Sequence, residues 1–279
     1  MRPTATAAAV GRAAYGAFAW VSLLVHSSAL ALVLALLPSL ERRRRAARWT
    51  AGLFLRSIGS PVKTLGTNPP DGGCVVVANH SSYLDGLILT AALPPRFTFL
   101  IKREMASVPL AGYILKRLGS KFVDRADARN RQQTARDLVA SAGQGEALAL
   151  FPEGTFDKRP GLKPFHSGAF GAAWRAALPI VPVVVLGARR KLPSGALLPR
   201  PGPLEVRICT PVASETFRTT KDLMHATPSA MLEQLGEPDL AAGRTTPEKW
   251  CLTPISGKTV SDTSFRGAGE RPGSVHIAE

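Results

Sequence analysis

The chain has 279 residues, of which 45% are hydrophobic and 20% are charged. This composition excludes an intrinsically disordered protein, and the length suffices for one domain with a small attachment. The 35 Lys and Arg exceed the 20 Asp and Glu, so the formal net charge of +15 predicts a polyanionic partner, either nucleic acid or an anionic membrane. Cys74, Cys209 and Cys251 are too dispersed for a disulfide framework or a zinc or redox pair, which favours a reducing cytosolic setting.

Residues 1–58 are predicted to form a helical segment that associates with a membrane. No Asp, Glu, Lys or Arg lies between Arg12 and Glu41, and residues 13–37 are long and apolar enough to span a bilayer. Three interpretations compete: a transmembrane helix, an interfacial helix broken into two pieces at residues 26–28, and a cleaved signal peptide. A buried core helix is a fourth alternative.

Four arginines at positions 42–45 follow the apolar run. They disfavour the signal peptide, which ends in small residues. In either membrane interpretation the arginines face anionic lipid on the cytoplasmic side. We therefore expect membrane localisation, with the rest of the chain at the cytoplasmic face of the cell membrane.

From Pro61 onward, short β-branched runs alternate with helical patterns. The predicted strands are 75–78, 97–101, 121–123, 147–151, 180–186 and 204–208, and the predicted helices are 83–92, 108–118, 129–142 and 168–177. This alternation predicts an α/β domain over residues 59–240, with a central, largely parallel sheet flanked by helices. Gly, Pro, Thr and Ser recur without apolar periodicity in residues 241–279, which predicts a flexible tail.

Several common site motifs are missing from the sequence. There is no phosphate-binding loop, dinucleotide fingerprint, nucleophile elbow or metal-ligand spacing. Aromatic residues are only 6% of the chain and no nucleic-acid recognition motif accompanies the charge. We therefore expect no bound metal and no nucleic-acid partner, which leaves the membrane as the polyanion.

A polar loop follows the predicted strand 75–78, and it contains His80 five residues before Asp85. The Asp85 carboxylate can accept a hydrogen bond from one ring nitrogen of His80 and leave the other as a base. The pattern is a Ser-His-Asp relay without its serine, so the nucleophile would be a substrate hydroxyl. The alternative is that Ser81 or Ser82 merely caps the next helix and that Asp85 stabilises its N-terminus.

Three further blocks follow in the chain. Gly119-x-x-Phe122-x-x-Arg125 is a strand that ends in a cation, residues 148–155 are a buried strand that ends in Pro-Glu-Gly-Thr, and residues 180–183 read Ile-Val-Pro-Val. Together with the His80 loop, these four blocks resemble the glycerolipid acyltransferase family, which includes the lysophosphatidic acid acyltransferases. The resemblance covers roughly residues 60–210.

The resemblance implies roles for individual residues. His80 would be the general base and Asp85 would hold its imidazole. The substrate-binding residues it implies are Arg125 for the acceptor phosphate, Glu153, Gly154 and Thr155 along the acceptor site, and Pro182 in the fourth block. Lys102 and Arg103 follow a predicted strand, where a second phosphate-binding cation would fit. Their alternative is a solvated surface pair.

One position departs from the family pattern. Phe156 stands where the family usually has Arg after Glu-Gly-Thr, so a cation near the acceptor phosphate is missing. Lys158 or Arg159 would replace it, or the acceptor head group differs. His166 is expected to be a loop residue rather than a second base.

We therefore expect a membrane-bound O-acyltransferase. It would move a fatty acyl chain from acyl-carrier protein or coenzyme A to 1-acyl-glycerol-3-phosphate, giving phosphatidic acid for phospholipid biosynthesis. The expected partners are membrane phospholipids, the lysophospholipid acceptor and the carrier thioester, and no cofactor is required. The alternatives are another lyso-lipid or glycerol-3-phosphate as acceptor, or a non-catalytic lipid-binding module.

Overall fold

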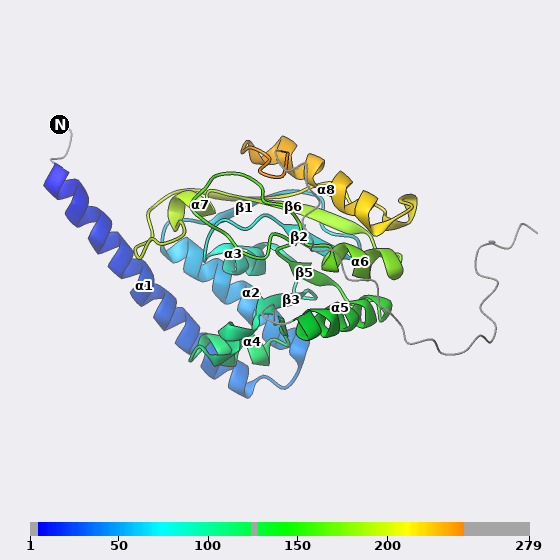
Figure 1. The fold of residues 1–279 in the computed structure, drawn as a ribbon. Coiled ribbons are helices and arrows are strands. Elements are labelled where there is room, and N and C mark those ends of the chain that lie inside the picture. Colours follow the sequence, from blue (N-terminus) through cyan, green and yellow to red (C-terminus); the bar gives the residue numbers. More distant parts are fainter. Residues whose placement is uncertain (1–4, 124–127, 243–279) are drawn as a thin grey trace, which may run out of the picture. The chain divides into compact units, whose positions relative to one another are not determined.

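Two helices precede the sheet in the computed structural model, which describes residues 5–123 and 128–242 (Figure 1). They are α1 (Ala5–Leu36) and α2 (Leu40–Ser57), and the side chain of Ser39 caps α2 by accepting the N–H of Arg42. Helix α1 is continuous through residues 26–28, so the predicted alternative of a broken helix is wrong. The predicted tail falls outside the described residues, apart from its first two positions.

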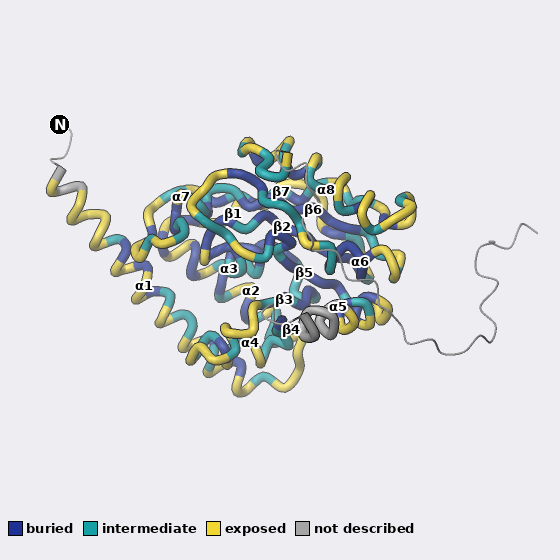
Figure 2. The backbone as a smooth tube through the Cα atoms, viewed as in Figure 1, coloured by how far each residue is buried: buried dark blue, intermediate teal, exposed yellow. Residues whose placement is uncertain are grey.

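One stripe of α1 is buried, and the other described positions are exposed or partly buried (Figure 2). The buried positions recur at helical spacing: Gly16, Ala19, Ser22, Leu30 and Leu34. Such spacing places them on one face of the helix. Residues 9–36 are long and apolar enough to cross a membrane by length and composition. The buried stripe nevertheless packs α1 along the α/β domain.

Side-chain hydrogen bonds fasten α1 to the domain at several points along its length. The Tyr15 hydroxyl donates to the carbonyl of Ile58 at 2.9 Å, and the indole N–H of Trp20 donates to that of Leu197 at 2.7 Å. Near the other end, the guanidinium of Arg117 donates to the carbonyl of Leu34. The helix is therefore part of the folded domain and not an appendage.

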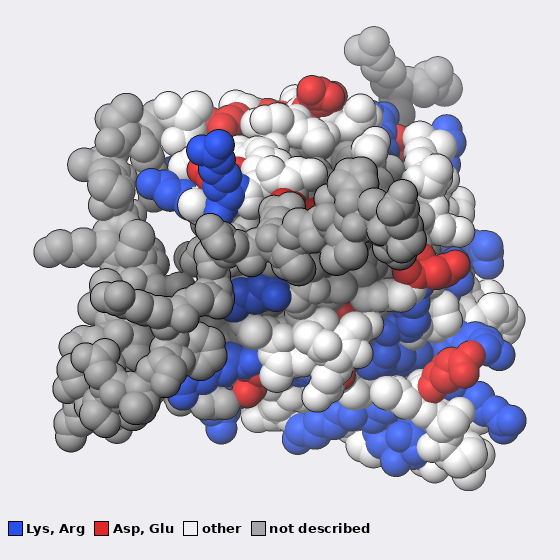
Figure 3. Space-filling model, turned by 90° about the vertical axis from the view of Figure 1, so that its right-hand side faces the viewer, with Lys and Arg blue, Asp and Glu red and all other residues white. Residues whose placement is uncertain are grey.

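The arginines at the start of α2 do not all face outward. The Arg44 guanidinium donates to the carbonyls of Leu118 and Arg96, at 3.0 and 2.8 Å, and to the Thr98 hydroxyl at 2.7 Å. Burial lowers the pKa of Arg44. The prediction that residues 42–45 all face lipid is wrong for Arg44, which joins α2 to the start of β3. Basic charge is not confined to α2, since Lys and Arg also outnumber acidic residues over the lower part of the face in Figure 3.

The described residues form one seven-stranded sheet in the order β1-β7-β6-β2-β5-β3-β4. Its strands are β1 (Val62–Gly66), β2 (Val75–Ala78), β3 (Thr98–Lys102), β4 (Lys121–Val123), β5 (Leu148–Leu150), β6 (Ile180–Leu186) and β7 (Leu204–Ile208). All neighbours are parallel except β6 and β7, which confirms the largely parallel α/β fold. The predicted strands agree closely with the observed ones, but β1 was not predicted.

The remaining helices cover the two faces of the sheet. They are α3 (Asp85–Ala92), α4 (Ala111–Arg117), α5 (Ala128–Gly143), α6 (Gly168–Arg175), α7 (Ala188–Lys191) and α8 (Thr220–Leu235). Val76 of β2 packs in one apolar cluster with residues of α2 and α3, whereas Val75 and Val77 pack in another with residues of α5, α6 and α8. Strand β2 is therefore buried on both faces, and the loop that follows it is rigidly placed.

Candidate active site

The carboxyl ends of β2, β5 and β6 meet at one edge of the sheet because these strands are parallel neighbours. Asn79, the first residue after β2, fixes this edge. Its side-chain amide donates to the carbonyl of Val185 at 3.1 Å and accepts the N–H of the same residue at 2.7 Å. No role was predicted for Asn79, although its position just before the histidine was a usable signal.

His80 and Asp85 form the predicted hydrogen bond. The distance between His80 Nδ1 and Asp85 Oδ2 is 2.9 Å. Because a carboxylate only accepts, Nδ1 is the donor, and in a neutral imidazole Nε2 would then carry the lone pair. The His80 side chain is 19% exposed and Asp85 is fully buried, so the base is reachable from solvent while its partner is not.

The chain folds tightly around Asp85. Its Oδ2 atom also accepts the backbone N–H groups of Ser81 and Ser82, at 2.6 and 2.8 Å. The hydroxyl of Ser82 in turn donates to the carbonyl of Leu192 at 2.8 Å. Asp85 is the first residue of α3, so it also stabilises the helix N-terminus. The N-cap of α3 is Leu84, which has no side-chain capping bond, so capping of this helix by Ser81 or Ser82 is wrong, whereas the place of Asp85 in the first turn is confirmed.

Glu153 connects two blocks that are far apart in the sequence. One carboxylate oxygen accepts the backbone N–H of His80 at 2.6 Å, and the other accepts that of Lys163 at 3.1 Å. The side chain is buried, and burial raises the pKa of Glu153 to about 7. The carboxylate thus holds the backbone on which the imidazole stands, a contact that the motif did not predict.

Aromatic rings surround the imidazole. The Phe151 ring stacks on His80 with centroids 4.2 Å apart, and the Phe156 ring lies 4.4 Å from it at 59°. Tyr83 meets Phe156 edge-on at 4.9 Å. Phe156, which stands in the place of the family's arginine, therefore contacts the predicted base instead of supplying a cation.

The rest of the third block forms a turn beside this cluster. Gly154 has a φ of +76°, a conformation that favours glycine, and the Thr155 hydroxyl accepts from the Lys163 ammonium at 3.2 Å. Arg159 forms an ion pair with Asp157 at 3.1 Å. Its bond lowers the pKa of Asp157. Of the two predicted replacement cations, Arg159 is thus engaged by a neighbouring carboxylate.

Three other predicted binding residues lie on β3, directly after β3, and on β6. Lys102, at the end of β3, is exposed and pairs with Glu104 at 2.9 Å, and the exposed Arg103 follows it. Pro182 is buried within β6 and pairs in register with Val77. Arg125 lies outside the described residues. His166 is held in the loop before α6 by its N–H, which donates to the carbonyl of Pro152.

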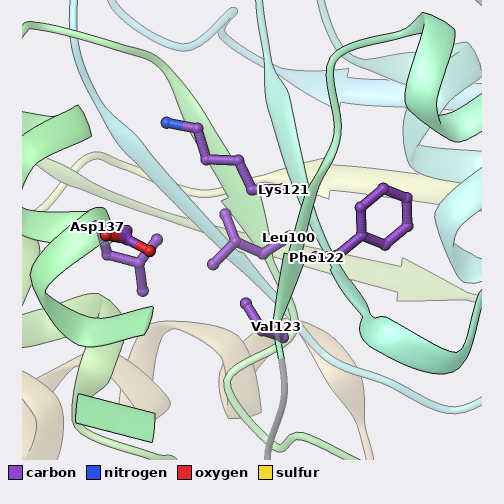
Figure 4. A pocket seen from close by; sticks show the side chains of 6 residues that line it. Leu100, Lys121, Phe122, Val123 and Asp137 are labelled. Atoms are coloured by element: carbon purple, nitrogen blue, oxygen red, sulfur yellow. The ribbon is translucent and has the colours of Figure 1, made fainter. Parts of the chain in front are cut away.

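A pocket of about 340 Å³ lies elsewhere on the sheet, beside β4 and α5 (Figure 4). Its lining is mostly apolar: Leu100, Lys121, Phe122, Val123, Asp137 and Leu138. The Lys121 ammonium pairs with Glu146 at 2.6 Å. None of the residues around the His80 imidazole contributes to this lining.

Residues 61–186 match the family model described as Acyltransferase. The chain carries an acyltransferase-family domain. This acyltransferase domain contains β1 to β6 and all the residues described around His80. The resemblance that the four blocks indicated is thereby confirmed.

Two curated relatives illustrate what the chain is similar to. It is 31% identical over 201 residues to the 1-acyl-sn-glycerol-3-phosphate acyltransferase of Saccharomyces cerevisiae, an alignment covering 68% of this chain and 65% of that protein. It is also 31% identical over 151 residues to the lyso-ornithine lipid O-acyltransferase of Pseudomonas aeruginosa, covering 54% of this chain and 57% of the relative. The chain thus spans less than two thirds of the length of these relatives.

The fold also occurs in a solved structure. The 1-acyl-sn-glycerophosphate (LPA) acyltransferase of Thermotoga maritima superposes with a TM-score of 0.69 at 20% identity. The superposition covers 81% of this chain and 95% of that one. This likeness supports the fold.

Proposed function

We propose that the protein is a membrane-associated O-acyltransferase that acylates the free hydroxyl of 1-acyl-sn-glycerol-3-phosphate and so produces phosphatidic acid. The observation that carries the proposal is the hydrogen bond between His80 and the buried Asp85 within an acyltransferase-family domain. The acyl donor is the thioester of acyl-carrier protein or coenzyme A. The reaction as proposed uses no metal and no prosthetic group.

In the proposed mechanism, His80 Nε2 takes the proton of the acceptor hydroxyl while the oxygen attacks the thioester carbonyl carbon. The C–O bond forms, the C–S bond breaks, and the carrier thiolate leaves and takes up a proton. Asp85 keeps the proton on Nδ1 and stabilises the imidazolium that forms. Glu153 would hold the backbone of His80 in place through the hydrogen bond that it accepts from the His80 N–H.

The acceptor head group would be bound by cations near the site. Arg125 is proposed to bind its phosphate, and Lys102 or Arg103 would supply a second cation from the end of β3. Phe156 contacts the His80 ring instead of offering a guanidinium, and one relative is named for a lyso-ornithine lipid. A second candidate function is therefore acylation of another lyso-lipid by the same base.

The exposed apolar side of α1 is proposed to lie in the cytoplasmic leaflet of the cell membrane. Arg42 and Arg45 are exposed at the start of α2, where they would meet anionic head groups. This placement brings the domain to its lipid acceptor. In this proposal the membrane phospholipids both surround α1 and bind the exposed arginines.

The proposal is tested by incubating the purified protein in vesicles with a labelled acyl thioester and a panel of acceptors. The panel includes 1-acyl-glycerol-3-phosphate, glycerol-3-phosphate and lyso-lipids without a free phosphate. His80→Ala should reduce transfer by at least about 10³-fold and leave the circular dichroism spectrum unchanged. His225→Ala, on the exposed side of α8, is the matched control.

Each outcome separates the candidate functions. Transfer to a lyso-lipid without a phosphomonoester in preference to 1-acyl-glycerol-3-phosphate would support the second candidate. Wild-type transfer by a well-folded His80→Ala protein would overturn the mechanism. Acceptor binding with no transfer from either thioester would leave the protein as a lipid-binding module.

A further inference from the structure

The loop between α7 and β7 is a closed and ordered structure. Its two ends meet because the N–H of Arg200 donates to the carbonyl of Lys191 at 2.8 Å, and the Lys191 ammonium donates back to the carbonyl of Arg200 at 3.2 Å. Inside it, the N–H of Ala196 donates to the carbonyl of Pro193, in a turn where Gly195 has a φ of +77°. A loop closed in this way presents its tip in a fixed direction.

Two leucines stand at the tip. Leu197 is 83% exposed, more than any other large hydrophobic residue that the structure describes, and Leu198 beside it is 42% exposed. A loop in water gains nothing from two adjacent exposed leucines. Apolar side chains grouped on a surface indicate a site for a partner or a membrane.

The tip lies against the membrane-associating helix. The Leu197 carbonyl accepts the indole N–H of Trp20, and a Cβ on Gly16 would lie 2.7 Å from the Leu198 Cβ. Glycine at position 16 therefore permits the close contact of loop and helix. Phe18 and Val21 of α1 are exposed nearby in the sequence, and Figure 1 shows the loop reaching α1.

The charge around this contact has one sign. Residues 1–40 and 187–204 contain no Asp or Glu, although the chain has 20 in total. Arg12, Arg190 and Arg200 are exposed in these two segments. Apolar side chains with a basic surround match the two layers of an anionic membrane surface, its acyl chains and its phosphates.

We infer that the loop at residues 193–200 inserts Leu197 and Leu198 into the bilayer as a membrane contact separate from α1. The inference rests on the proposed function, in which α1 lies in the membrane. A Cβ on Gly195 would lie 3.1 Å from Cε of Lys158, so the same loop also touches the turn that follows Glu153. The insertion thus brings the acceptor side of the site to the lipid surface.

The inference is tested with a polarity-sensitive fluorophore (NBD) attached at Leu197→Cys, in a background that carries Cys209→Ser and Cys251→Ser. The matched control carries the label at Lys221→Cys, an exposed position on α8, across the sheet from α2. Vesicles of phosphatidylethanolamine and phosphatidylglycerol are added, and protein binding is followed separately by co-sedimentation. We expect a blue shift and increased emission at position 197 and no change at position 221.

The outcomes distinguish the inference from the proposal beneath it. Binding to vesicles without a spectral change at position 197 would overturn the insertion and leave the α1 anchor standing. Failure to bind vesicles would overturn the membrane association and the insertion with it. A blue shift that needs no vesicles and rises with protein concentration would mean that a second copy of the chain covers the loop.

A second variant tests the energetic contribution of the tip. Leu197→Ser should lower the vesicle partition coefficient roughly tenfold, because a leucine side chain would no longer enter the acyl layer. Leu197→Met keeps the apolar area and should bind as the wild type does. The melting temperature in detergent should be the same for all three proteins, since the side chain is exposed. Equal partition of Leu197→Ser and wild type would contradict the insertion.

Discussion

Asp85 and Lys191 are both fully buried charged residues, yet their surroundings differ. Lys191 donates from its ammonium to the Tyr15 hydroxyl at 2.8 Å, to the Ser60 hydroxyl and to the carbonyl of Arg200, so its three donors are all used. Asp85 receives all its hydrogen bonds on Oδ2, while its buried Oδ1 atom has no hydrogen-bond partner in the structure.

The difference separates a structural link from the proposed catalytic pair. A complete network around Lys191 holds α1 to the domain and leaves nothing for a substrate. The Oδ2 atom of Asp85 instead accepts the hydrogen bonds that orient His80 and its loop, and the buried Oδ1 atom has no hydrogen-bond partner among the described residues. Incomplete pairing of a buried group is tolerated where function requires it.

The largest expected effect comes from removing the charge of Asp85. Asp85→Asn should lower the rate of acyl transfer roughly 10²–10⁴-fold, because the amide cannot stabilise the imidazolium and disturbs the tautomer of His80. Single-turnover kinetics with a labelled thioester measure the effect. A rate within about twofold of the wild type, in a protein that still binds vesicles, would contradict the role given to Asp85.

Replacing Lys191 should lower the stability of the protein and leave its turnover unchanged. Lys191→Met keeps the shape of the side chain but leaves buried oxygens without donors, so the free energy of unfolding should fall by about 1–3 kcal/mol. The turnover of the protein that remains folded should not change. Denaturant unfolding and activity, measured on the same preparation, check both statements. A loss of turnover with unchanged stability would assign Lys191 to the site and remove the contrast with Asp85.

The pH dependence of stability tests a third buried charged residue, Glu153. Its pKa is raised from 4.5 to about 7, so the folded protein holds this proton more tightly than the unfolded chain does. Stability from this group is therefore lost as the pH rises from about 4.5 to about 7. Glu153→Gln does not titrate, so the melting temperature of the wild type relative to the variant should fall across this range. A constant difference would show that the carboxylate is already ionised at the lower pH.

The smallest effect separates two neighbouring arginines. Arg45 is exposed and pairs with Glu41 on its own helix, whereas Arg44 donates to Thr98 at the start of β3. Arg45→Gln should weaken binding to anionic vesicles several-fold at low salt, since one basic residue contributes about 1 kcal/mol near such a surface. Arg44→Gln should instead lower the melting temperature. Identical behaviour of the two variants would contradict the division between them.

The central strands were predictable because each is a short buried apolar run between helical patterns. The edge strand β1 was missed, since four of its five residues are exposed and its partner β7 lies about 140 residues further along the chain. Helix α8 was missed because Pro228 interrupts its pattern. Strand β1 was thus missed because it depends on distant pairing, and α8 because its own sequence contains a residue that usually breaks helices.

The candidate site also contains both contacts that local sequence predicts and contacts that depend on the tertiary structure. The five-residue spacing of His80 and Asp85 is local, and the predicted hydrogen bond is present. The bond from the His80 backbone to Glu153 depends on β2 and β5 being neighbours, which residue spacing does not reveal. The inward turn of Arg44 and the packing of Phe156 on His80 also depend on tertiary contacts.

The rings of Phe151 and Phe156 against the His80 imidazole bear on a competing reaction, hydrolysis of the acyl thioester. A base that deprotonates a lipid hydroxyl would equally deprotonate water, which is far more abundant. Two apolar rings beside the imidazole reduce the number of water molecules that reach it, while a lipid acceptor brings its hydroxyl together with an apolar body. In the proposed reaction, the aromatic surround would therefore favour transfer of the acyl chain over its loss to solvent.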